Sequence, residues 1–75
     1  MNEKELSAFP QRLERLRCRR RISRMVLSEL CGLNKNAISR YERGEQMPSV
    51  NALIAIADFF EVSTDYLLGR DAYDP

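Results

Sequence analysis

Histidine and tryptophan do not occur in this 75-residue chain, and cysteine occurs only twice. Structural zinc sites generally need four cysteine or histidine ligands, so this composition does not predict a metal site. No glycine-rich phosphate-binding loop is present, and there is no histidine to act as a general base. The sequence therefore predicts neither an enzyme nor a bound cofactor.

Long hydrophobic runs are also missing. No segment approaches the roughly 20 consecutive apolar residues that a membrane span needs, and the first residues, MNEKELSAF, do not resemble a signal peptide. We therefore expect a single small domain in the cytoplasm, with no membrane partner. Cys18 and Cys31 fall within predicted helices, where we expect them to be buried or half-buried apolar residues.

Charge is distributed unevenly along the chain, although the formal net charge is only +1. Residues 10–24 contain seven arginines and one acidic residue, whereas residues 49–75 contain five acidic residues and one arginine. A basic stripe beside a recognition helix is typical of a protein that contacts phosphates. For each single arginine, a solvated helix face is the other interpretation.

Residues 22–44, ISRMVLSELCGLNKNAISRYERG, predict two short helices joined by a turn. Ser23 is a candidate N-cap for a helix over residues 24–31, and Gly32 is expected to end it. Two helices joined by a three- or four-residue turn containing glycine form a helix-turn-helix, whose second helix enters the major groove of DNA. The spacing therefore predicts this motif.

The second helix of the motif is predicted at about residues 35–43. Asn34 offers a capping side-chain oxygen, and Gly44 lies where a left-handed residue ends a helix. Ile38 and Tyr41 are spaced to face the core together. The residues expected on the opposite, exposed face are Lys35, Asn36, Ser39, Arg40 and Arg43.

Three more helices are predicted around the motif. Ser7 is a candidate cap for the first, with Pro10 in its first turn, and Ser49 marks the start of the fourth. Ser63 is a candidate cap for a short fifth helix that ends before Gly69. The residues expected to face the core from these helices are Phe9, Leu13, Leu16, Leu53, Ile56, Ala57, Phe60, Leu67 and Leu68.

Four segments carry a resemblance to a known family: LERLR in the first helix, ISRYERG closing the third, MPSVNALIAIADFF in the fourth and VSTDYLLG in the fifth. Together they resemble the Cro and lambda-repressor type of helix-turn-helix protein, also called the xenobiotic response element family. The resemblance implies an all-α fold, a compact bundle of five helices. Residues 1–75 would then form one DNA-binding domain, with an ordered core at about 7–69 and a loose tail at 70–75.

The resemblance also implies residues that contact DNA bases. Lys35, Asn36 and Arg40 match the family's main base-reading positions. Lysine and arginine can donate to guanine O6 and N7, and asparagine can pair with adenine N6 and N7. Ser39 lies on the same face and is a further candidate, although its short hydroxyl could instead fill space or meet a phosphate.

Phosphate contacts are implied at Arg24, where family members commonly have glutamine, and at Asn34 and Arg43. Arg17 and Glu42 match two positions that form a partly buried ion pair in the family. That pair ties the first helix to the third, so neither residue is expected to contact DNA.

The chain departs from the family pattern at two positions where glycine is common, Arg21 and Glu61. Phe59 and Tyr66 are aromatic residues near its C-terminal helices. These form a candidate contact patch, but we favour the interpretation that they are half-buried core aromatics.

A third departure is the apolar character of Met25, Val26 and Leu30, at helix positions that are usually polar. Val26 and Leu30 are one helical turn apart and are predicted to form an exposed apolar strip. Two ways of covering it stay open: the N-terminal residues Leu6 and Phe9, or a partner.

The expected function is sequence-specific binding of double-stranded DNA as a transcriptional regulator, and the resemblance favours a repressor of the phage or mobile-element kind. A homodimer on a pseudo-palindromic operator is expected, because one recognition helix reads only a few base pairs. An antitoxin that also binds its own promoter is the alternative. A pure protein-interaction module is a third class, and it would bind DNA no better than any weakly charged protein.

Overall fold

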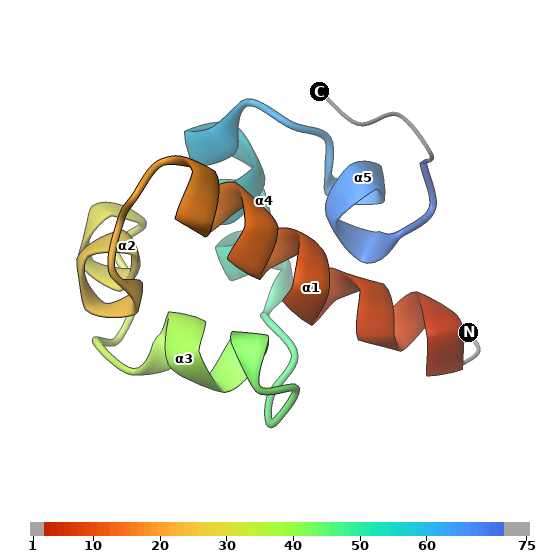
Figure 1. Ribbon diagram of the computed structural model, residues 1–75, viewed down its shortest axis with the longest axis horizontal. Helices are drawn as coiled ribbons and strands as arrows, with labels where there is room; N and C mark the ends of the chain where they lie inside the picture. Colours follow the sequence, from red (N-terminus) through yellow and green to blue (C-terminus); the bar gives the residue numbers. More distant parts are fainter. Residues whose placement is uncertain (1–2, 72–75) are drawn as a thin grey trace.

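The computed structural model describes residues 3–71, with side chains from Ala8 onward. This part forms five helices without a strand, which confirms the all-α prediction: α1 Glu3–Arg19, α2 Arg24–Leu30, α3 Ala37–Glu42, α4 Val50–Phe60 and α5 Thr64–Leu68. Helix α1 crosses the molecule and packs against both α3 and α5, while α2 packs on α3 and α4 on α5 (Figure 1). Among residues 3–71, no helix combines the length and the hydrophobicity of a membrane span.

Serine side chains begin three of the helices, as the sequence predicts. The hydroxyls of Ser23, Ser49 and Ser63 accept the backbone N–H of the residue three positions later, at 3.1, 3.1 and 2.9 Å. Each bond satisfies one of the N–H groups that the first turn of a helix leaves without a partner. These three starts are therefore encoded locally.

The predicted start of the first helix is wrong. Helix α1 begins at Glu3, so Ser7 lies inside it and Pro10 lies in its interior. The residues before Ser7 include glutamate, lysine and leucine, which are good helix formers and extend the helix towards the N-terminus. Proline removes one backbone hydrogen bond from a helix. Helix α1 nevertheless continues past Pro10 to Arg19, and the neighbouring Phe9 is buried in the core.

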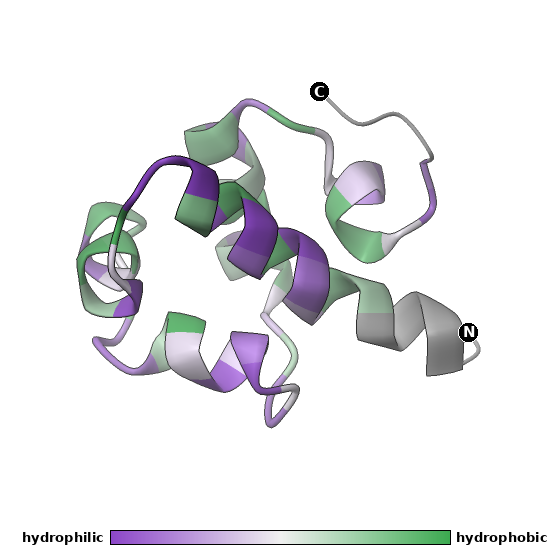
Figure 2. Ribbon diagram, in the orientation of Figure 1, coloured by the Kyte–Doolittle hydropathy of each residue, from purple (hydrophilic) through white to green (hydrophobic). Residues whose placement is uncertain are grey.

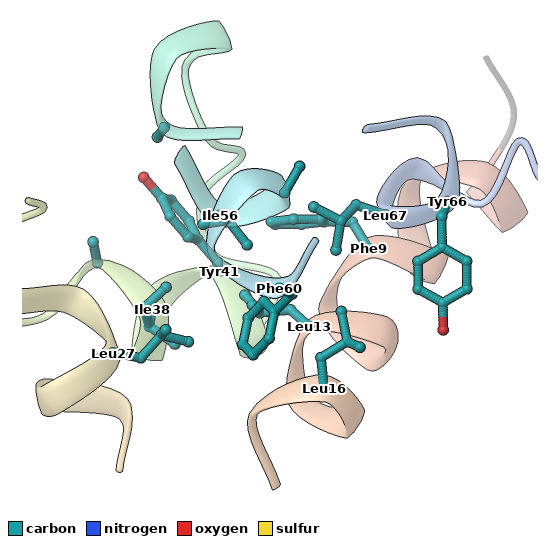
Figure 3. Packing of buried hydrophobic residues seen from close by; sticks show 13 residues of the cluster. Phe9, Leu13, Leu16, Leu27, Ile38, Tyr41, Ile56, Phe60, Tyr66 and Leu67 are labelled. Atoms are coloured by element: carbon teal, nitrogen blue, oxygen red, sulfur yellow. The ribbon is translucent and has the colours of Figure 1, made fainter. Parts of the chain in front are cut away.

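The hydrophobic core lies between α1 and the other helices (Figure 3). Leu27 of α2 and Ile38 of α3 lie together at one end of it, with no exposed surface. Of the predicted core residues, Leu53 and Leu68 are half-buried, and the others are buried: Phe9, Leu13, Leu16, Ile56, Ala57, Phe60 and Leu67. The helical spacing therefore identified most of the core, but it placed Leu53 and Leu68 too deep and missed the buried Ala52.

All five helices end with the same pair of backbone hydrogen bonds, the Schellman motif. The motif needs a residue with positive φ, and Gly32, Gly44 and Gly69 supply it at three ends. Arg21 and Glu61 supply it at the other two, each with φ of 56°. These are the two positions where the family pattern has glycine, so the departure places a side chain in a conformation that normally costs about 1 to 2 kcal/mol.

The expected loose tail at 70–75 lies mostly outside the described residues. The backbone N–H of Arg70 donates to the carbonyl of Asp65 at 2.9 Å. The carbonyl of Asp71 accepts Nη1 of Arg12, also at 2.9 Å. The first two residues of the expected tail are therefore attached to α5 and α1.

Candidate nucleic-acid interface

The turn between α2 and α3 is longer than predicted, because α3 begins at Ala37. The side chain of Asn34 bonds the turn and is not the N-cap of α3. Oδ1 of Asn34 accepts the backbone N–H of Asn36 at 3.0 Å, and the backbone carbonyl of Asn34 accepts the N–H of Ala37 at 2.9 Å. An asparagine that bonds the backbone two residues on forms an Asx turn. Lys35 and Asn36 therefore lie in the turn, and Asn36 is the N-cap without a capping side-chain bond.

The predicted base-reading residues lie on an accessible surface. Lys35, Asn36 and Arg40 are exposed, and Ser39 is half-buried. The opposite side of α3 is buried at Ile38. Hydrophilic residues occupy the C-terminal half of α3 and the turn that follows (Figure 2). The helix thus presents polar groups on one face and packs with the other.

Ser28 was not among the predicted site residues, and it has no exposed surface. Its Oγ donates to the carbonyl of Arg24 at 3.0 Å and accepts the backbone N–H of Ile38 at 3.2 Å. One hydroxyl therefore joins the backbones of α2 and α3. Its position next to Leu27 on the inward side of α2 is a signal that sequence analysis can use, because a serine in a helix often bonds the carbonyl four residues back.

The ion pair between Arg17 and Glu42 is present and has two hydrogen bonds. Nε of Arg17 donates to Oε2 at 2.6 Å, and Nη2 donates to Oε1 at 3.1 Å. The side chains of Arg17 and Glu42 are 11% and 1% exposed. The hydrogen bond to Glu42 raises the pKa of Arg17 above its usual value. Nη1 of the same guanidinium donates to the carbonyl of Ile22 at 2.8 Å, so the pair fixes α1, α3 and the segment before α2.

Arg24, predicted to contact phosphate, shares this carboxylate. Its Nε donates to Oε1 of Glu42 at 2.8 Å, while half of its side chain is exposed. The first residue of α2 is thereby joined to the last residue of α3. The phosphate contact stays a prediction, and the structure adds a protein partner that orients the guanidinium.

Arg43, a second predicted phosphate contact, forms an exposed ion pair with Glu45. Nε donates to Oε2 at 2.9 Å and Nη2 donates to Oε1 at 3.2 Å. A phosphate would have to compete with this nearby carboxylate. Exposed pairs contribute little energy, so the competition is weak.

The basic segment does not form one stripe along the helix-turn-helix. The guanidinium of Arg12 lies 4.5 Å from the ring centroid of Tyr66 in α5, and that of Arg20 lies 5.5 Å from the ring of Phe59 in α4. Arg12 Nη1 also donates to the carbonyl of Tyr66 at 2.6 Å. Arg12 and Arg20 therefore do not belong to a basic stripe beside the helix-turn-helix, because their side chains pack on the C-terminal helices by cation–π contact.

The predicted apolar strip on α2 is exposed: Met25, Val26 and Leu30 are 54%, 45% and 58% exposed. Phe9 does not cover it, since that ring is buried against Tyr41 with centroids 5.9 Å apart. The side chain of Leu6 lies outside the described residues.

The predictions of burial are confirmed for Cys31, Phe59 and Tyr66 and are wrong for Cys18. Cys31 is half-buried as predicted, but Cys18 is exposed. Cys18 lies on α1 beside the exposed Arg19 and Arg20, so its position on a helix did not imply burial. Phe59 is half-buried and Tyr66 is buried, which confirms them as core aromatics.

Known proteins that are similar to this chain include two regulators identified by sequence and one controller protein identified by structure. The HTH-type transcriptional regulator AnsR of Bacillus subtilis is 38% identical over 60 residues, which cover 80% of this chain and 52% of that protein. Repressor protein C2 of Salmonella phage P22 is 38% identical over 61 residues, which cover 77% of this chain and 28% of that protein. The crystal structure of the restriction-modification controller protein C.AhdI from Aeromonas hydrophila has a TM-score of 0.75 at 28% identity, covering 85% of this chain and 97% of that one.

The match to a protein family covers most of the chain and is not limited to the helix-turn-helix motif. The chain spans about half the length of AnsR, 52%. A family model described as helix-turn-helix matches residues 13–67, from the middle of α1 to the end of α5. The fold, the helix-turn-helix and these relatives agree, and the chain belongs to the helix-turn-helix family.

Proposed function

We propose that this chain is a sequence-specific double-stranded DNA-binding transcriptional regulator that represses by occupying an operator. The observation that carries the proposal is the two-sided character of α3, with Ile38 in the core and Arg40 exposed. The names of the relatives support it, because they are transcriptional regulators and one is a repressor. A regulator of this kind acts in the cytoplasm and needs no catalytic group.

Base contacts are assigned to the exposed polar groups in the turn before α3 and in the middle of α3. Asn36 pairs with adenine, and Lys35 and Arg40 donate to guanine. Ser39 is half-buried, so it contacts only a base that approaches α3 closely. Each good pair discriminates by about 1 to 3 kcal/mol against the wrong base.

Phosphate contacts are assigned to Arg24, Asn34 and Arg43, around the two ends of α3. Glu42 occupies the Nε edge of Arg24, which leaves the terminal nitrogens to meet a phosphate. Arg43 exchanges Glu45 for a phosphate on binding. These contacts fix the orientation of the domain and carry no sequence information directly.

Two copies bind one operator. A single recognition helix reads only a few base pairs, so two-fold related copies place their helices roughly 34 to 36 Å apart on a pseudo-palindrome. A selected site without inverted symmetry, bound by one copy, contradicts this part of the proposal.

The test begins with selection of a binding site from a random duplex library by the purified chain. Asn36→Ala and Arg40→Ala are each expected to lose about 1 to 3 kcal/mol on the selected operator while changing binding to random duplex little. Arg24→Ala is expected to weaken both duplexes similarly and to reduce the slope of log affinity against log salt by about 1. Arg70→Ala removes the same charge at the end of α5 and is the matched control for Arg40→Ala.

Two results contradict the proposal. The first is that the wild-type chain selects no sequence and binds every duplex equally. The second is that Arg24→Ala relaxes the preference at one base pair while Arg40→Ala leaves every preference intact. The second result would remove α3 as the recognition element.

A further inference from the structure

The hydroxyl of Ser28 is the most enclosed polar group between α2 and α3. It donates to the carbonyl of Arg24, one turn back in α2, and it accepts the N–H of Ile38 in α3. Both of its partners are backbone atoms. The oxygen therefore fixes one helix relative to the other without a flexible side chain between them.

The start of α3 depends on this bond in a way that the other short helices do not. Helices α2 and α5 begin with their own serine caps, whereas the N-cap of α3, Asn36, makes no capping side-chain bond. The N–H groups of Asn36 and Ala37 are bonded by Asn34, and the N–H of Ile38 is bonded by Ser28. The position of α3 along and around its axis is thus set partly by α2.

We propose that Ser28 is a positioning residue that determines the base specificity of α3. The role rests on the proposed function. Asn36 and Arg40 are carried by the same short stretch of backbone as Ile38, so they move with it. Hydrogen bonds to base edges need donor–acceptor distances of about 2.7 to 3.2 Å and weaken steeply at angles below about 120°, so a small displacement of α3 weakens them. Phosphate contacts through long arginine side chains adapt to the same displacement.

The experiment compares Ser28→Ala with the wild-type chain on three probes: the selected operator, operators with single base-pair changes, and random duplex. Ser28→Ala leaves the N–H of Ile38 without its acceptor, and its discrimination between operator and changed operators is expected to fall roughly threefold to tenfold, the equivalent of one hydrogen bond. Affinity for random duplex and the salt slope are expected to match the wild type. Hydrogen exchange at the Ile38 amide is expected to accelerate.

Two further variants separate positioning from loss of stability. Ile56→Val removes a methylene from the buried core at α4 without touching the bond between α2 and α3, and it is expected to keep full discrimination. Ser28→Cys keeps the size of the side chain with a weaker acceptor. Ser28→Cys is expected to give an intermediate loss of discrimination between the operator and the changed operators. It replaces Ser28→Ala in the comparison if Ser28→Ala does not fold.

The proposal is overturned if Ser28→Ala, or Ser28→Cys in its place, loses affinity for all three probes in the same proportion. It is also overturned if discrimination stays at the wild-type value, or if Ile56→Val loses as much. Failure of the wild-type chain to prefer any duplex is a different result, because it refutes the proposed function itself.

Discussion

Two glutamates near the end of α3 have opposite surroundings. The Glu42 side chain is 1% exposed and accepts hydrogen bonds from Arg17 and Arg24, which come from α1 and α2. The Glu45 side chain is 55% exposed and pairs with Arg43, its neighbour in the same turn. The first pair joins distant parts of the chain, and the second joins residues that are already close.

The difference shows that burial and sequence separation decide what an ion pair contributes. Exposed pairs are worth little, since water and salt screen them and two long side chains must be ordered. Removing one partner of a buried pair leaves the other charge without compensation. Glu42 is therefore expected to be necessary for the fold, while Glu45 is not.

The largest expected effect is that of Glu42→Ala. It strands the mostly buried guanidinium of Arg17 and is expected to lower the free energy of unfolding by about 3 to 5 kcal/mol. Urea unfolding followed by circular dichroism measures the loss. A loss no greater than that of Glu45→Ala would show that burial does not distinguish the two carboxylates.

A third glutamate sharpens the comparison, because Glu61 is exposed but holds a left-handed backbone at φ 56°. Glu61→Gly is expected to stabilise the fold by roughly 0.5 to 1 kcal/mol, the relief of this strain less the greater freedom of glycine in the unfolded chain. Glu61→Ala is the control, since it removes the charge and keeps the strain. If both variants have the same stability, the backbone is not the cause.

A smaller effect is expected for Glu45→Ala, at about 0.2 to 1 kcal/mol. This contribution is expected to disappear in about 1 M salt, where the Debye length is about 3 Å. Measuring the difference between Glu45→Ala and wild type in low and high salt tests it. A difference that survives high salt would mean that Glu45 does more than pair with Arg43.

The smallest effect is confined to alkaline pH and concerns Tyr41, next to Glu42 in α3. Burial raises the pKa of Tyr41 above 10.0 in the folded protein. Deprotonation is therefore easier in the unfolded chain, so the stability linked to Tyr41 is complete below about pH 10 and is lost as the pH rises through the folded pKa. Tyr41→Phe is expected to lose less stability than wild type over this range.

Cys31 also loses its contribution to stability at alkaline pH, so the effect of Tyr41 must be isolated by comparing Tyr41→Phe with wild type. Burial also raises the pKa of Cys31 above 9.0. Unfolding curves at a series of pH values for both proteins isolate the tyrosine. Parallel stability curves above pH 10 would exclude a contribution from Tyr41.

Local hydrogen bonds account for what the sequence by itself determined. The starts at Ser23, Ser49 and Ser63 follow from bonds to the third residue on, and helical spacing identified the core. The pairing of Arg17 with Glu42 came from the family resemblance. For the helix starts and the core residues the sequence positions alone carry the information, because helix geometry relates them to space.

Contacts between distant residues were decided only by the tertiary structure. The start of α3 depends on Ser28 of another helix, and the orientation of Arg24 depends on Glu42. Arg12 belongs to the basic segment in the sequence, yet it lies against Tyr66 in α5. The physical reason is that these bonds join groups brought together when apolar surfaces pack, and a helical period does not specify which surfaces meet.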